Sequence, residues 1–130
     1  MVGKKFHGYD WIKIEFNKYT FNTPGNKYIV DFDNQGNDDY NVVFKTIDKL
    51  EDSTNEGVQF KVMATILEIV KHFIAAYPYK ALTFKPRDGR RHKLYKLFID
   101  NNFSTNDYHF YVRPDIIKMI KKWVIQFIAI

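Results

Sequence analysis

The sequence contains no cysteine, so it has no disulfide, no thiolate nucleophile and no thiolate metal ligand. This composition fits a reducing compartment. The four histidines show no metal-ligand spacing, and we expect no metal site; they are His7, His72, His92 and His109. No serine-centred nucleophile motif is present either.

Long apolar runs are also missing. The longest segments, such as WVIQFIAI at 123–130, are far shorter than the roughly 20 residues that a transmembrane helix needs. The opening MVGKKFHGYD has charges without an apolar run behind them, and Gly3 is not placed for myristoylation. We expect a soluble, intracellular protein with no membrane partner.

The chain does have enough apolar material to fold. Of its 130 residues 45% are hydrophobic and 18% aromatic, which is far from the composition of disordered chains. A chain of this length buries roughly two-thirds of its unfolded surface as one domain. We therefore predict a single domain over residues 1–130.

The net charge of +5 comes from one stretch. Residues 85–96, here called the basic segment, hold six basic residues and only Asp88 as an acid; the six are Lys85, Arg87, Arg90, Arg91, Lys93 and Lys96. The other 118 residues carry fourteen charges of each sign, because 20 − 6 and 15 − 1 are equal. A local patch favours a docking spot or a ligand pocket over diffuse binding to nucleic acid or membrane.

The first third of the chain predicts antiparallel strands. Residues 9–16 alternate, with Ile12, Ile14 and Phe16 on one side, as in a half-buried strand that residues 19–22 continue. Turn signals at 23–26 and 34–39 bound a second strand at 27–33 with Tyr28, Val30 and Phe32 on one face. A third strand is predicted at 40–47.

A long buried helix is predicted next, at about 54–77. Ser53 and Glu56 have the spacing of a capping box, and Pro78 ends the helix. Apolar residues cover most of its circumference and leave a narrow polar strip, which we expect to be solvated: Lys61, Thr65, Glu68 and His72.

The last third alternates between strands and helices. We predict a strand at 79–84, a helix at about 89–101, a strand at 108–113 and a short helix at 114–122. Residues 123–130 either prolong that helix or form a last strand, and their β-branched and aromatic content favours the strand. A strand, a helix and a strand between 40 and 84 imply a parallel pair with a right-handed crossover. The fold class is therefore mixed α+β with a mixed central sheet.

This order of elements resembles the core of the GNAT superfamily of N-acetyltransferases, over roughly residues 27–111. In that family the helix after the second parallel strand carries a Leu-Tyr pair, which Leu94 and Tyr95 match, and Phe103 falls where a later Phe is found. The long helix, the short strand and Arg91-x-x-Leu94-Tyr95 are similar to small uncharacterised GNAT-like proteins of bacteriophages. The resemblance implies a place for Tyr95 near a thioester, as a general acid; the alternative, which we favour, is a tyrosine that packs on the sheet edge.

The resemblance breaks at the cofactor. Acetyl-CoA enzymes of this superfamily place a glycine-rich motif before the long helix to hold the pyrophosphate. Residues 46–57 contain a single glycine and four carboxylates against one lysine. Four carboxylates repel a pyrophosphate, so we expect no cofactor, with acetyl-CoA kept as the alternative.

The basic segment divides on a helical wheel. Arg91 falls near the middle of the predicted apolar side, whereas His92, Lys93 and Lys96 fall on a solvated side. A charge on an apolar face needs a partner, so Arg91 either pairs with a carboxylate of residues 48–56 or binds an anion. Any anion site would include Lys85, Arg87 and Arg90 as well.

Three functions follow as expectations. The first is a phage-type GNAT-like protein without acetyltransferase activity that binds an anionic surface of a protein or nucleic acid, or other phage proteins, in the host cytoplasm or the virion. The second is an acyl-CoA-dependent N-acetyltransferase that uses Tyr95, for which Glu68 and His72 are base candidates by residue type alone. The third is nucleic-acid binding, with Tyr108, Phe110 and Tyr111 available for stacking.

Overall fold

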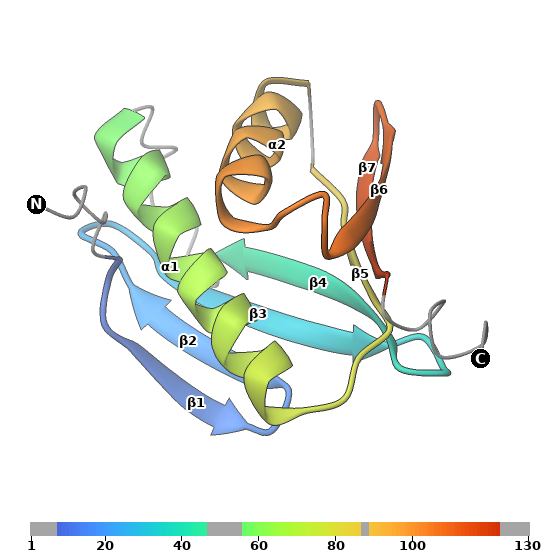
Figure 1. Cartoon of the computed structure of the whole chain (residues 1–130). Coiled ribbons are helices and arrows are strands. Elements are labelled where there is room, and N and C mark those ends of the chain that lie inside the picture. The colour runs from blue at the N-terminus through green and yellow to red at the C-terminus, as the bar shows by residue number, and fades with distance from the viewer. Residues whose placement is uncertain (1–7, 47–55, 87–88, 123–130) are drawn as a thin grey trace, which may run out of the picture. The chain divides into compact units, whose positions relative to one another are not determined.

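The structure is a computed structural model of the 130-residue chain, and it describes residues 8–46, 56–86 and 89–122. It contains two helices and seven strands (Figure 1). Their bounds are β1 Trp11–Glu15, β2 Lys18–Asn22, β3 Lys27–Asn34, β4 Asp39–Thr46, α1 Glu56–Ala76, β5 Ala81–Phe84, α2 Gly89–Asn102, β6 Tyr108–Arg113 and β7 Ile116–Lys121.

The strands form a mixed sheet in the order β1-β2-β3-β4-β5-β7-β6. β4 and β5 are parallel, with Tyr40 opposite Leu82 and Val42 opposite Phe84. β1–β2, β2–β3, β5–β7 and β6–β7 are antiparallel. The predicted mixed α+β class and the predicted parallel pair around the long helix are therefore confirmed.

The residues group into two compact units. The first unit comprises Met1–Asp31 and Phe44–Ala76, and the second comprises Phe32–Val43 and Tyr77–Ile130. Each unit is described by itself below.

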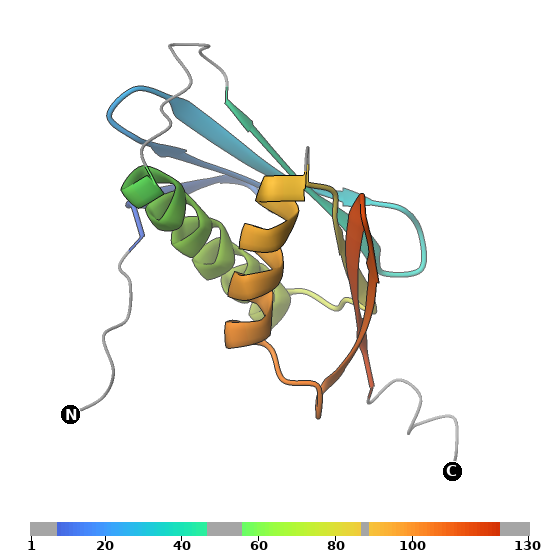
Figure 2. The same cartoon turned by 90° about the horizontal axis from the view of Figure 1, so that it is seen from above.

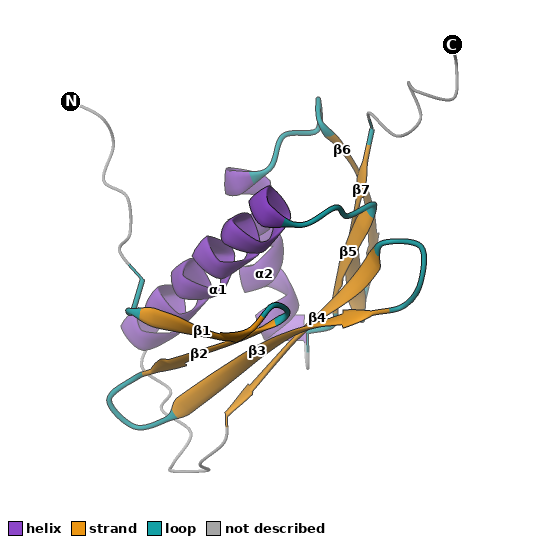
Figure 3. Ribbon diagram, turned by 90° about the horizontal axis from the view of Figure 1, so that it is seen from below, coloured by secondary structure: helices purple, strands orange, loops and turns teal. Residues whose placement is uncertain are grey.

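In the first unit, α1 lies along β1 and β2 (Figure 3). The predicted long buried helix is confirmed, because its residues from Val62 to Phe73 are mostly inaccessible to solvent. Ser53 of the predicted capping box lies outside the described residues. The helix presents its apolar side to strand residues that are equally buried; these include Tyr19, Phe21 and Val30.

The polar strip of α1 is exposed at Lys61, Glu68 and His72, as expected from the sequence, but Thr65 is buried beneath residues 8–9. The backbone N–H of Tyr9 donates to Thr65 Oγ1 at 2.7 Å, and the N–H of Gly8 donates to Glu68 Oε1 at 3.2 Å. Thr65 is fully buried, and its hydroxyl in turn donates to the Lys61 carbonyl at 2.7 Å. Tertiary contacts from a distant segment explain this outcome, which helical periodicity cannot reveal.

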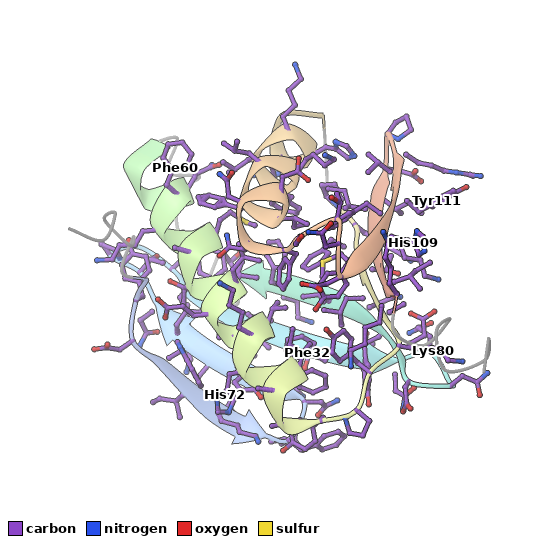
Figure 4. The ribbon with its side chains drawn as sticks, viewed as in Figure 1. Phe32, Phe60, His72, Lys80, His109 and Tyr111 are labelled. Carbon is purple, nitrogen blue, oxygen red and sulfur yellow. The ribbon has the colours of Figure 1, made fainter. Side chains whose placement is uncertain are left out.

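His72, which Figure 4 labels on the last turns of α1, lies against residues of β1 and β2. Its ring contacts the Trp11 ring edge to face, with 5.0 Å between centroids, and the Tyr19 ring at 5.9 Å. The histidine is thus part of an aromatic contact rather than a base in a cleft.

The first predicted strand is wrong in two respects. Residues 18–22 do not continue it; they form β2, which returns antiparallel after a turn at Phe16 and Asn17. The side of β1 that carries Ile12 and Ile14 is exposed, at 69% and 51%. The reason is register: Trp11 pairs with Phe21 and Lys13 with Tyr19, so the side of β1 that carries Trp11 shares the face of the buried Tyr19 and Phe21, and Trp11 is half-buried there.

The two predicted turns are confirmed. The Thr23 N–H donates to the Asn26 carbonyl at 2.8 Å. Between β3 and β4 three successive residues have positive φ: Gly36 at 97°, Asn37 at 54° and Asp38 at 61°. Gly and Asn tolerate this left-handed backbone best and Asp is the next, which explains why the reversal falls here.

In the second unit, β5 is the central strand and all four of its residues are buried. β7 runs beside it and α2 packs against β7 (Figure 2). The core of this unit includes Tyr40, Val42, Leu82, Phe84, Tyr95, Ile99, Phe103, Ile117 and Met119. The predicted helix at about 89–101 is confirmed as α2.

The predicted helix at 114–122 is wrong, because Pro114 and Asp115 form a turn and β7 follows. Ile117 and Met119 are fully buried while their neighbours are half-buried, which is the period of a strand. A proline that is followed by an acid fits a turn as well as a first helical turn, and three isoleucines favour the strand. Residues 123–130, also predicted as a strand, lie outside the described residues.

We predict that Gly8→Ala destabilises the protein by roughly 1–3 kcal/mol. A Cβ at residue 8 would lie 2.7 Å from the Thr65 Cα and 2.8 Å from the Thr65 nitrogen, so the segment would have to leave the helix. Chemical denaturation measures the loss.

Gly25→Ala is the matched control, because a Cβ there meets nothing within 4 Å. We expect its free energy of unfolding to stay within about 0.5 kcal/mol of the wild type. Equal stability of the two variants would show that residue 8 does not pack against α1.

Candidate anion-binding site at the start of helix α2

The basic segment begins where the parallel strand β5 ends. Phe84 closes the strand, Lys85 is exposed and Pro86 is buried, and α2 starts at Gly89. In open α/β sheets, ligands bind beyond the carboxyl ends of the strands, and a helix N-terminus there favours an anion. The fold thus puts the basic segment at a favourable place for anion binding.

The charges at this end of α2 are unusual. Its first turn, GRRH, contains no acidic residue and has Arg90 and Arg91 instead. The positive end of a helix dipole stabilises anionic groups, so cations in the first turn carry an electrostatic cost. Residues 87–88, with the predicted anion-site residue Arg87, and the side chain of Arg90 lie outside the described residues.

The buried face of α2 is turned relative to the prediction. It runs through Tyr95 and Ile99, which are 5% and 0% exposed, and Phe103, directly after the helix, is 7% exposed. Arg91 is half-buried at the margin of this face, not in its middle, and the apolar side chain of Leu97 is 51% exposed. The predicted apolar side was centred near Arg91, whereas the buried Tyr95 and Ile99 lie further round the helix, by roughly a sixth of a turn.

His92 is half-buried, although a solvated position was predicted. Its Nε2 is buried and has no hydrogen-bond partner among the described residues. Lys93 is exposed as predicted, and Lys96 is half-buried, with its ammonium 2.5 Å from Asp100 Oδ2. Sequence periodicity contained the signal for His92, since it is spaced three and seven residues before Tyr95 and Ile99.

Tyr95 packs into the core of the second unit at 5% exposure. A general acid has to come within hydrogen-bond reach of its substrate, and a side chain this covered is placed for packing. The alternative that Arg91 pairs with the acidic stretch at 48–56 concerns residues that are largely outside the described ones, so it stays a prediction.

A second polar cluster, which the sequence reasoning missed, joins Tyr79, Tyr108 and Lys121 in the same unit. The hydroxyls of Tyr79 and Tyr108 share a hydrogen bond. The Lys121 ammonium nitrogen lies 3.8 Å from the centre of the Tyr79 ring. Tyr108 and Lys121 are direct cross-strand partners of β6 and β7, a register that only the tertiary structure defines.

Burial raises the pKa of Tyr79 well above its usual value of 10.0, and the hydrogen bond with Tyr108 and the nearby charges of Tyr108 and Asp107 raise it further. Burial also lowers the pKa of Lys121. A tyrosine held in its protonated form is not a base at neutral pH. The cluster therefore joins the start of β6 to the residues just before β5 through a hydrogen bond and a cation–π contact.

Within residues 8–46, 56–86 and 89–122, no group of three His, Asp or Glu side chains is placed to hold a metal ion. Neither of the two described helices is long and apolar enough to cross a bilayer.

We predict that Tyr79→Phe costs about 1 kcal/mol at neutral pH, because it removes one buried hydrogen bond. The dependence of the free energy of unfolding on pH should change as well, on the alkaline side. Since the folded pKa lies above the unfolded 10.0, the contribution of Tyr79 is complete below pH 10.0 and is lost above it, by up to ~1.4 kcal/mol per pH unit.

Denaturation curves at rising pH measure this difference. The wild type should lose stability above pH 10.0 more steeply than Tyr79→Phe. If the wild type and Tyr79→Phe lost stability equally steeply at alkaline pH, the buried, protonated state of this tyrosine would be contradicted.

The chain was compared with known proteins. No curated protein and no solved structure matches it. One family model matches residues 5–127, and its description is a family of unknown function, DUF6934. Because that match spans nearly the whole chain, the protein belongs to the DUF6934 family.

Proposed function

We propose that this protein is a GNAT-like domain of the bacteriophage type that works as a small binding protein through the basic segment, without acetyl transfer. Two features support the scaffold. The long helix α1 joins the parallel strands β4 and β5, and the next helix carries Leu94 and Tyr95 at the place where the superfamily has its Leu-Tyr pair. The partner is an anionic protein surface, in the host cytoplasm or in the virion.

The observation that carries the proposal is the placement of cations at the start of α2. Arg90 and Arg91 occupy the first turn, which contains no acidic residue, and exposed Lys85 and Lys93 flank it in the sequence. Repulsion among these cations and from the helix dipole costs stability in the free protein. A bound anion relieves that cost and so gains affinity from it.

Two features argue against an acetyltransferase. Tyr95 is buried at 5% exposure, and residues 46–57 offer four carboxylates where a pyrophosphate would have to bind. The acyl-CoA reading remains the alternative that the first experiment tests.

Thermal unfolding with acetyl-CoA or CoA separates the two functions. A ligand at 100 times its Kd stabilises the folded state by ~2.7 kcal/mol, which is a clear rise in Tm. We expect no rise at millimolar cofactor. A rise of several degrees would overturn the proposal in favour of the acyl-CoA enzyme.

Charge reversal tests the basic segment. We expect Lys85→Glu/Lys93→Glu to weaken binding to heparin, the polyanion probe, and to lower the slope of log affinity against log salt by about 2. Fluorescence anisotropy at several salt concentrations gives both quantities.

The matched control is Lys27→Glu/Lys45→Glu, which changes the net charge equally at two exposed lysines of the first unit. Equal weakening by both double variants would show a diffuse charge effect and defeat the proposal. Single-stranded DNA is run beside heparin. DNA binding that is stronger than heparin binding at the same salt would favour the nucleic-acid reading instead.

A further inference from the structure

The strand β6 forms one edge of the sheet (Figure 1). Among the described strands it pairs only with β7, and the pairing is regular over all six residues, from Tyr108–Lys121 to Arg113–Ile116. Its outer backbone N–H and C=O groups therefore present an even row of donors and acceptors.

This edge lacks the protection that the opposite edge has. β1 contains a β-bulge between Lys13 and Glu15, and both devices, a bulge and an edge lysine, discourage pairing with another strand. The segment YHFYVR of β6 has no bulge, no proline, no lysine and no acid. An unprotected regular edge is competent for strand addition.

The side chains along β6 are accessible on both faces. His109 and Tyr111, labelled in Figure 4, point to one face together with Arg113 and are exposed. Phe110 and Val112 share the other face with buried Met119 and Ile117, yet Val112 is 42% exposed. Tyr111, at 43%, carries the Arg113 guanidinium 4.9 Å from its ring centre.

The sequence of this edge is complementary to itself. When two identical strands pair antiparallel across a two-fold axis, opposite residues must point to the same face of the sheet. Side chains alternate between the faces, so the numbers of opposite residues differ by an even number. The two-fold axis therefore passes through a residue. Centring on Phe110 places Phe110 opposite itself, Tyr108 opposite Val112 and His109 opposite Tyr111. At both ends it places Asp107 opposite Arg113, and no like charges face each other.

We propose that β6 is a homodimerisation edge, where β6 pairs antiparallel with β6 of a second copy around Phe110 to continue the sheet across a two-fold axis. The charge pair of Asp107 with Arg113 of the second copy, formed twice, sets this register. The interface is independent of the basic segment and of the proposed function. One strand pair buries a small area, which belongs to the weak, concentration-dependent class of interfaces.

Sedimentation equilibrium up to millimolar concentration measures the association. We expect a reversible dimer of the wild type. Asp107→Arg alone and Arg113→Asp alone should each weaken it by about tenfold or more, because each puts like charges opposite at both ends.

The decisive measurement mixes the two single variants. Their equimolar mixture should form a heterodimer of near wild-type affinity, since the arginines of one copy then face the aspartates of the other. The backbone bonds of residue 107, to the Ser104 carbonyl at 3.1 Å and from the Lys122 N–H at 2.9 Å, do not depend on its side chain. Circular dichroism of each variant checks that it is folded.

Asp100→Arg and Lys93→Asp are matched controls, because they make the same charge changes at exposed positions of α2. We expect neither control to weaken the dimer and their mixture to gain nothing. A wild type that stays monomeric at millimolar concentration would overturn the proposal. So would a dimer that the controls weaken equally, or one that the mixture of Asp107→Arg and Arg113→Asp does not restore.

Discussion

The parallel pairing of β4 with β5 is the constraint on which the rest of the fold depends. Parallel neighbours cannot be joined by a tight turn, so the chain needs a long crossover, and α1 supplies it with 21 residues. The pairing also places the starts of both strands side by side. The Lys80 N–H therefore reaches the Asp38 carbonyl of the β3–β4 turn at 2.7 Å, and Tyr79 lies at the same end as Tyr108 and Lys121.

The same pairing gives the opposite end of the strands its chemical character. Beyond Phe84 the chain passes directly into the basic segment and into the first turn of α2. That turn places two arginines and no acidic residue where the helix dipole is already positive, and this position favours an anionic group. The basic segment thus follows the C-terminal end of β5, and the Tyr79–Tyr108–Lys121 cluster lies at its N-terminal end.

The two edges of the sheet differ in how they meet solvent. β1 is bulged and bears Lys13, although Ile12 and Ile14 are among the most exposed apolar side chains of the described residues. β6 is regular and has neither a bulge nor a lysine. A regular edge strand without these protections can pair with a further strand. The difference between the two edges therefore bears on association, which the burial of side chains does not reveal.

The sequence by itself determined the features that depend on local physics. The long helix, the turns at 23–26 and 34–39, the buried strand before the basic segment and α2 follow from periodicity and turn chemistry, and the structure confirms them. The location of the net charge in residues 85–96 is likewise a property of sequence alone.

The tertiary structure decided which faces are covered. β2 as a separate strand, the exposure of Ile12, the buried Nε2 of His92 and β7 in place of a helix all depend on what packs against each segment. An amphipathic pattern states that one side is apolar; it does not state which neighbour lies against it. Register and packing join residues that are far apart in the chain, as with Tyr79 and Tyr108, and no local pattern records such a pair.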